Sequence, residues 1–144
     1  EDTEFNCRIY QKSCQAVIID IPMYYWVQRP TSITHQKVNP RYIDRADSYY
    51  LCLQNIPKEN TVYRGCCLEK LFKMIINVRY HASNTPYRHL AHLTAKRLKK
   101  QTANEFLKNR HIPFHIKLSL LSFYYIPPLY SGFMKLCETK ARKK

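Results

Sequence analysis

Glycine is almost absent from this chain, which has only Gly65 and Gly132 among its 144 residues. β-Sandwiches and β-barrels need many tight turns, and glycine supplies the positive φ angles that such turns use. Dinucleotide-binding and P-loop folds need glycine-rich phosphate loops, which two isolated glycines cannot form. The scarcity of glycine therefore predicts few turns and a mostly helical protein. Gly65 falls inside a helical apolar stripe, so we expect a close helix crossing there.

Long apolar runs are also missing. A helix that spans a bilayer takes about 20 consecutive apolar residues, and the longest candidates here are residues 16–27 and 118–134. The first is too short, and Pro127 and Pro128 interrupt the second. We therefore expect no segment of this sequence to cross a membrane.

Catalytic and metal-binding signatures are missing as well. The sequence has neither the GxSxG of a nucleophile elbow nor the HExxH of a zinc protease, and no cysteine pair has zinc-finger spacing. Charged helix faces often carry paired histidines or carboxylates, so such pairs are weak indications of chemistry. The pairs in this chain are His89 with His92, His111 with His115, and Asp44 with Asp47. We expect no enzyme activity, no cofactor and no metal.

Acidic residues are few. The chain has 24 Lys and Arg against 10 Asp and Glu, which gives a net charge of +14. A charge of this size indicates an anionic partner, which could be nucleic acid, an acidic glycoprotein or a membrane surface. The length of 144 residues predicts one domain that can bury its own core.

Helical periodicity dominates the first half of the chain. Apolar residues recur at spacings of three and four over residues 7–25, which predicts a helix with a kink at Pro22. The pair Asn39-Pro40 is a helix start signal, because asparagine caps a helix and proline suits its first position. The long helical stretch that follows, about 40–80, either bends at Pro57 or restarts there.

The second half shows the same period. Asn84-Thr85-Pro86 is another start signal, and it predicts a helix over about 86–109 with one basic face. A shorter helix is expected to end near Tyr124. Pro127-Pro128 predicts an irregular tail after it, and residues 138–144 are expected to be a mobile basic terminus.

The cysteines allow two readings. An even number in a secreted chain permits up to three disulfides, whereas a reduced cysteine behaves as a small buried hydrophobe. Both readings stay open for each of the six, Cys7, Cys14, Cys52, Cys66, Cys67 and Cys137.

Three short stretches resemble the abalone sperm lysin family in their order and spacing. They are YRHLAHLTAKRL at 87–98, FLKNRHIP at 106–113 and YSGFMK at 130–135, and the resemblance extends over roughly residues 5–136. It implies a single lysin-like domain over residues 1–144, an all-α, compact up-down bundle of about five helices. It also implies a secreted, non-enzymatic protein. The cysteines depart from the family pattern, because lysin is built without them.

Within that family the chain is more similar to the fusagenic acrosomal branch than to lysin itself. That similarity implies a fertilisation protein of the acrosomal granule, secreted to promote sperm–egg membrane fusion through a cationic, amphipathic helical surface. Its partner would be the egg plasma membrane or another anionic lipid surface. One alternative is lysin-like binding of an egg-coat glycoprotein, which dissolves the envelope without cleaving a bond. A second alternative is a basic helical protein that binds nucleic acid.

Two apolar clusters, residues 16–27 and 118–134, contain more apolar residues than one buried helical stripe requires. The clusters either cover each other or leave aromatic residues exposed at the depth in a membrane that Trp and Tyr prefer. The candidates for membrane contact are Tyr24, Trp26, Val27, Phe123, Tyr125, Ile126, Leu129 and Tyr130. The candidates for the basic surface are Arg29, Lys37, Arg41, Arg88, Lys96, Lys99, Lys100 and Lys117.

Overall fold

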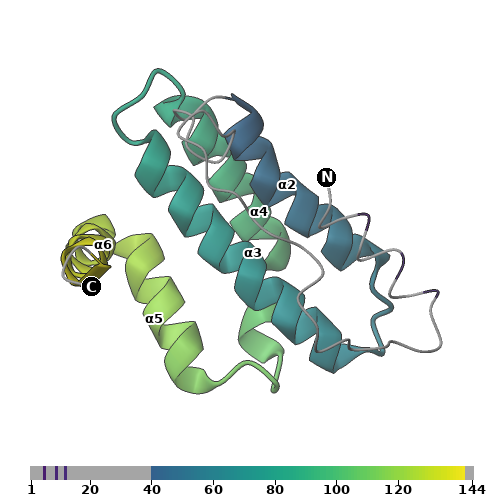
Figure 1. Ribbon diagram of the computed structural model, residues 1–144. Coiled ribbons are helices and arrows are strands. Elements are labelled where there is room, and N and C mark those ends of the chain that lie inside the picture. Colours follow the sequence, from purple (N-terminus) through teal and green to yellow (C-terminus); the bar gives the residue numbers. More distant parts are fainter. Residues whose placement is uncertain (1–4, 6–8, 10–11, 13–39, 142–144) are drawn as a thin grey trace, which may run out of the picture.

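The computed structural model describes residues 5, 9, 12 and 40–141, and between residues 40 and 141 the chain forms five helices and no strand (Figure 1). The predicted all-α bundle of about five helices is confirmed. The helix predicted over residues 7–25 lies outside the described residues, except for positions 9 and 12, which are helical. The five helices are α2 (Pro40–Asn55), α3 (Thr61–Ala82), α4 (Arg88–Lys108), α5 (Phe114–Tyr125) and α6 (Pro127–Ala141).

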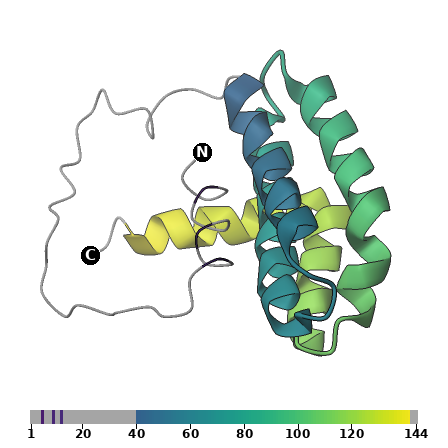
Figure 2. The same ribbon diagram turned by 90° about the vertical axis from the view of Figure 1, so that its right-hand side faces the viewer.

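Helix α3 lies at the centre of the bundle and packs against each of the other four helices. Short turns make α2, α3 and α4 antiparallel neighbours, and α5 covers another side of α3 (Figure 1). Helix α6 follows α5 at a steep angle and extends away from the bundle (Figure 2). The side chains of α5 and the first part of α6 are consequently covered less than those of α3.

The stretch predicted over 40–80 consists of two helices, because the chain reverses at Pro57. The amide of Asn60 donates to the carbonyl of Pro57 at 3.1 Å, which closes the turn. The Asn60 side chain then accepts the amide of Tyr63 at 3.1 Å, and this bond caps the start of α3. Of the two predicted outcomes, the restart at Pro57 is correct and the bend is wrong. The reversal brings the apolar faces of α2 and α3 together.

Helix α4 begins at Arg88, two residues later than the start predicted at Pro86. A tight turn occupies the intervening residues. The Thr85 hydroxyl donates to the carbonyl of Ala82 at 2.9 Å and accepts the amide of Tyr87 at 3.3 Å. The sequence signal therefore locates the turn rather than the first helical residue.

The irregular tail predicted after Pro127-Pro128 is wrong, because α6 runs from Pro127 to Ala141. Proline is tolerated in the first turn of a helix, where its missing N–H would have no helical partner. Residues 138–141, predicted to belong to a mobile terminus, are helical, and residues 142–144 lie outside the described residues.

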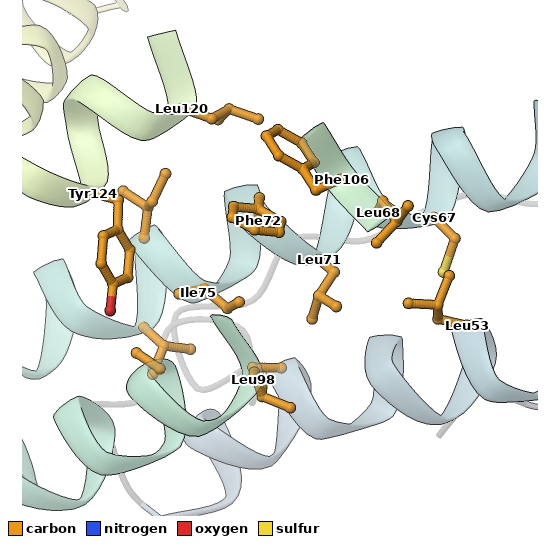
Figure 3. Packing of buried hydrophobic residues seen from close by; sticks show 14 of the residues in the cluster. Leu53, Cys67, Leu68, Leu71, Phe72, Ile75, Leu98, Phe106, Leu120 and Tyr124 are labelled. Atoms are coloured by element: carbon orange, nitrogen blue, oxygen red, sulfur yellow. The ribbon is translucent and has the colours of Figure 1, made fainter. Parts of the chain in front are cut away.

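The core is centred on two phenylalanines that join α3 to α4 (Figure 3). The rings of Phe72 and Phe106 are stacked with centroids 4.0 Å apart, and both side chains are fully buried. Burial of one such side chain contributes roughly 1.5–3 kcal/mol. Leu120 and Tyr124 bring α5 onto the same core. Other fully buried members of the core are Ile43, Leu68, Leu71, Ile75 and Leu98.

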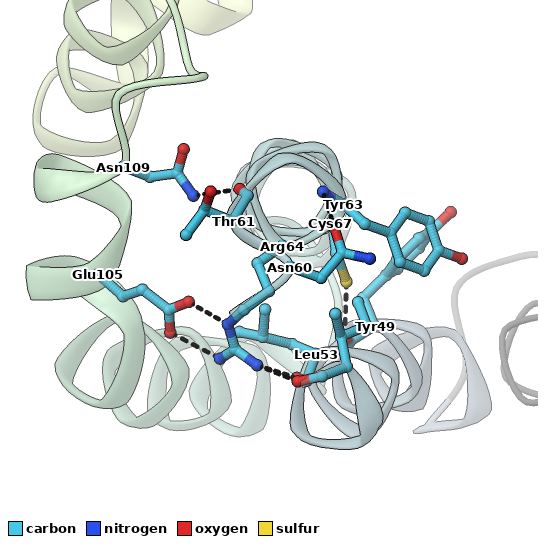
Figure 4. A network of polar contacts seen from close by, with 10 residues as sticks. Tyr49, Leu53, Asn60, Thr61, Tyr63, Arg64, Cys67, Glu105 and Asn109 are labelled. Carbon is cyan, nitrogen blue, oxygen red and sulfur yellow. Dashed lines mark hydrogen bonds and ion pairs between the residues drawn. The ribbon is translucent and has the colours of Figure 1, made fainter. Parts of the chain in front are cut away.

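A buried arginine joins α2, α3 and α4 (Figure 4). The side chain of Arg64 donates from Nε and Nη2 to the two carboxylate oxygens of Glu105, at 2.5 and 2.8 Å. Its Nη1 donates to the carbonyls of Leu53 and Ile56, at 2.9 and 2.5 Å. Carbonyls at the end of a helix lack partners within that helix. Arg64 therefore completes the end of α2 while it pairs with α4.

A close helix crossing was expected at Gly65, and the neighbour found there is the side chain of Asn109, the residue that follows α4. A Cβ atom at this position would lie 2.9 Å from Oδ1 of Asn109, which is closer than such contacts allow. The Asn109 side chain is fixed in place, because its Nδ2 donates to the carbonyl of Thr61 and its Oδ1 accepts the amide of His111, both at 2.9 Å. Glycine thus makes room for the turn that links α4 to α5.

Candidate functional site

Net positive charge is concentrated in the part of the chain that runs from the second half of α3 into α6, because acidic residues are scarce there. Residues 70–137 contain twelve Lys and Arg but a single acidic residue, Glu105, which is engaged by Arg64. In this part of the chain carboxylates are too few to neutralise the cations. A surface of this kind attracts anionic partners.

The basic face predicted on α4 is present on the side turned away from the core. Ala91, Ala95 and Leu98 are buried, whereas the basic residues at the complementary spacings are exposed or, in the case of Lys99, half-buried. We name as the cationic face Arg88, His92, Lys96, Lys99 and Lys100. Four of the eight predicted basic-surface residues therefore lie on one helix face.

Tyr124 connects this face to α5. Two cations lie over its buried ring, with Arg79 Cζ 4.5 Å and Lys99 Nζ 4.8 Å from the ring centroid. Arg79 Nη1 also donates to the carbonyl of Tyr124 at 2.8 Å. A cation over an aromatic face contributes about 0.5–2 kcal/mol. These contacts hold the end of α5 against α3 and α4.

Tyr125 continues the connection outward. Lys99 Nζ donates to its hydroxyl at 2.8 Å and lies 4.6 Å from its ring centroid, yet 64% of Tyr125 remains exposed. The next apolar residues, Ile126 and Leu129, are each 50% exposed. Phe133, one turn beyond Leu129 on α6, is also exposed. We name as the apolar edge Tyr125, Ile126, Leu129 and Phe133. The cationic face and the apolar edge meet at the contact between Lys99 and Tyr125.

The other two aromatic candidates of this region lie deeper. Phe123 and Tyr130 are half-buried, with ring centroids 5.3 Å apart, and Tyr130 contacts the ring of Tyr80 at the same distance. The Tyr130 hydroxyl donates to Oδ1 of Asn77. Both residues belong to the support of the apolar edge rather than to its exposed part.

The remaining predicted residues are located elsewhere or lie outside the described residues. Arg41 is exposed in the first turn of α2. Lys117 is half-buried on α5 and donates from Nζ to the carbonyl of Leu107 at 2.8 Å, so it stabilises the last turn of α4. The candidates outside the described residues are Tyr24, Trp26, Val27, Arg29 and Lys37. The cluster 16–27 lies there too.

The paired carboxylates of α2 are engaged differently from an acid–base pair. The carboxylate of Asp47 accepts a hydrogen bond from Arg97 of α4, and Asp44 is exposed. Burial raises the pKa of Asp47, and the nearby Arg97 opposes this shift without cancelling it. Among the described residues, no group of three His, Cys, Asp or Glu side chains could hold a metal ion.

Three of the six cysteines are placed by the structure. Cys52 and Cys67 are buried in the core, and Cys67 Sγ donates to the carbonyl of Tyr49 at 3.5 Å, whereas Cys66 is exposed. For Cys67 the buried-thiol reading is therefore correct. The structure does not describe Cys7, Cys14 or the side chain of Cys137.

No family model, no curated protein and no solved structure matches this chain in comparisons with known proteins. The resemblance to the lysin family stays a prediction from the sequence. Among the described helices, none is both long and apolar enough to cross a bilayer.

The sequence did not point to the two residues that fix the end of α5 beside the cationic face. In the sequence, Arg79 resembles an ordinary surface residue and Tyr124 an ordinary core residue. Only the packing of α5 on α3 brings the two into contact. The clue available in the sequence was the scarcity of carboxylates around these cations, which left aromatic rings as their partners.

Proposed function

We propose that this protein binds anionic membrane surfaces through the cationic face and promotes the fusion of bilayers by inserting the apolar edge into the lipid interface. The observation that carries the proposal is that Lys99 contacts Tyr125, so the two surfaces adjoin. A cationic surface alone would serve any polyanion. Exposed tyrosine and aliphatic side chains beside it favour a membrane interface, where such residues partition.

The expected energies are sufficient for reversible binding. Each Lys or Arg near an anionic bilayer contributes about 1 kcal/mol. The four cations Arg88, Lys96, Lys99 and Lys100 would together contribute about 4 kcal/mol, or roughly a thousandfold in affinity. Ile126 and Leu129, each half exposed, add burial of apolar surface. Charge would therefore supply most of the attraction, and the apolar edge would disturb lipid packing.

The biological setting of the proposal comes from the sequence resemblance. In that setting the protein is a non-enzymatic fertilisation protein, stored in the acrosomal granule and secreted to act on the egg plasma membrane. An egg-coat glycoprotein and nucleic acid are the competing partners for a surface of this charge.

The test is binding to vesicles of phosphatidylcholine with about one-third phosphatidylserine, measured by co-sedimentation. Lys96→Gln with Lys100→Gln removes two exposed cations, so binding should weaken by about 2 kcal/mol, roughly thirtyfold. The matched control is Lys58→Gln with Lys70→Gln, which removes the same charge from exposed positions away from the cationic face. We expect the control to keep most of its affinity.

Two results would overturn the proposal. One is an equal loss of binding in both double variants, since net charge would then explain the association without a defined face. The other is displacement of the protein from vesicles by an equal phosphate concentration of duplex DNA. That result would favour a nucleic-acid partner.

A further inference from the structure

A cavity of about 930 Å³ opens where the end of α3, the start of α4 and the α5–α6 junction meet. One wall carries basic side chains, the guanidinium groups of Arg79 from α3 and Arg88 from α4 and the imidazole rings of His89 and His92. Among the described residues that line the cavity, none is Asp or Glu. Ligand sites commonly measure about 300–1,000 Å³, so this space is large enough for an anion with an organic body attached.

The cationic wall is preorganised in part. Arg79 is held by its contacts with the carbonyl and the ring of Tyr124, and a guanidinium carries five N–H groups, of which the carbonyl takes one. Arg88 and His89 occupy the first turn of α4. Helices favour carboxylates at that end, where the helix dipole is positive. The Arg88 guanidinium at this position opposes helix stability, and an anion bound there would relieve the repulsion.

Aromatic rings line another part of the cavity. The ring of Tyr130 lies 5.3 Å from the rings of both Tyr80 and Phe123, and its hydroxyl is bonded to Asn77. All three rings belong to residues that line the cavity, together with Pro127 and Pro128. Such a wall suits an apolar body, and its Pro127 and Pro128 stand between Ile126 and Leu129 of the apolar edge along the chain.

We propose that this cavity is a binding site for the headgroup of an anionic phospholipid. Its phosphate would lie against Arg79, Arg88 and His89, and its glycerol and first acyl carbons against Phe123 and Tyr130. This inference rests on the proposed membrane function and adds headgroup recognition to it. A free phosphate could use only the cationic wall, whereas a lipid uses both.

The experiment uses the full chain and a soluble lipid probe, dihexanoyl phosphatidic acid, below the concentration at which it forms micelles. Calorimetric titration should show saturable binding. Arg88→Gln with His89→Gln should lower the affinity at least tenfold, about 1.4 kcal/mol. The control Lys58→Gln with Lys70→Gln should change it less than threefold. Vesicle binding of each protein is measured alongside, and circular dichroism verifies that each variant is folded.

The outcomes separate the site from the membrane function. If vesicles bind and the soluble lipid does not, the cavity is no headgroup site, and the membrane proposal stands. If the soluble lipid binds and vesicles do not, the site stands and the membrane proposal fails. Inorganic phosphate that binds as tightly as the lipid would show that the aromatic wall contributes nothing, and would overturn the inference. Tighter binding of a sulfated oligosaccharide would overturn it in favour of a glycan ligand.

Discussion

Replacing Arg64 by methionine is the substitution whose effect the structure predicts most sharply. Methionine keeps an unbranched apolar side chain at a site where only 8% of the residue is exposed. It removes all four hydrogen bonds that the guanidinium donates, two to the Glu105 carboxylate and two to the carbonyls of Leu53 and Ile56. The change therefore tests whether this polar network stabilises the junction of three helices.

The loss of unfolding free energy depends on the Glu105 carboxylate, which stays in place without its partner. Removing one partner of a buried ion pair costs about 3–5 kcal/mol, because the other charge stays uncompensated. The Glu105 side chain is 38% exposed, so water reaches it and the cost should fall near the lower limit, about 3 kcal/mol. For a domain of this size, 1 kcal/mol shifts Tm by roughly 4 °C. We therefore expect Tm to fall by about 12 °C.

The assay is thermal and urea unfolding followed by far-ultraviolet circular dichroism. Glu105→Gln alone should cost less than Arg64→Met, and the double variant should recover part of the loss, because it leaves no unpaired carboxylate. A loss below about 1 kcal/mol for Arg64→Met would refute the reasoning. So would additive effects of the two single variants, since coupling within the network requires non-additivity.

Three further predictions follow from particular side chains. Gly65→Ala should lose about 1 kcal/mol of stability in denaturant unfolding, because overpacking against Asn109 outweighs the helix propensity gained. At the control position, Gly132→Ala, the new Cβ meets no atom within 4 Å, so that variant should gain stability. A gain in both variants would contradict the crowding at Gly65. The raised pKa of Asp47 means that the folded state favours its protonated form, so stability present at low pH is lost as pH rises past about 4. Asp47→Asn should thus be at least as stable as the parent at pH 7 in urea titrations; a clear loss would mean that attraction to Arg97 exceeds the penalty of burial. Trp26 is the single tryptophan, so its fluorescence reports on the cluster 16–27. If that cluster contacts lipid, the emission should shift to the blue when anionic vesicles are added. Unchanged emission, together with a destabilised Trp26→Ala variant, would place Trp26 in the core.

The helical class could be predicted from the sequence because glycine content and apolar period are properties of the chain itself. The spacing of the apolar residues could not reveal the direction in which successive helices run. Apolar residues keep the same spacing on both sides of Pro57, and only the turn closed by Asn60 decides that α2 and α3 are antiparallel. At Pro127 and Pro128 the sequence predicted an irregular tail, and the structure has a helix that begins there, since a proline pair can begin a helix as well as end one.

The part of the candidate surface that lies on one helix could be predicted from the sequence, whereas the contacts between helices could not. The basic face of α4 repeats along one helix, so its spacing is visible in the sequence. The contact of Lys99 with Tyr125 joins residues 26 positions apart, and the pairing of Arg64 with Glu105 joins residues 41 apart. Contacts of that kind depend on how helices pack, and local spacing does not encode them.

The most direct test of the membrane role separates binding from fusion. In the double variant Ile126→Ser with Leu129→Ser, the cationic face is intact and the apolar edge loses two half-exposed side chains. The matched control, Leu51→Ser with Val62→Ser, changes comparably exposed apolar residues on α2 and α3. Mixing of vesicle contents and vesicle binding are measured for both, at about 0.1 M salt and at 1 M, where the Debye length falls from about 10 to about 3 Å.

The account predicts that the Ile126 and Leu129 variant still binds anionic vesicles at low salt but mixes their contents at least tenfold more slowly, whereas the control fuses like the parent. Binding of all three proteins should be lost at high salt. Contents mixing by the Ile126 and Leu129 variant at the parental rate would contradict the account, because the apolar edge would then have no part in fusion.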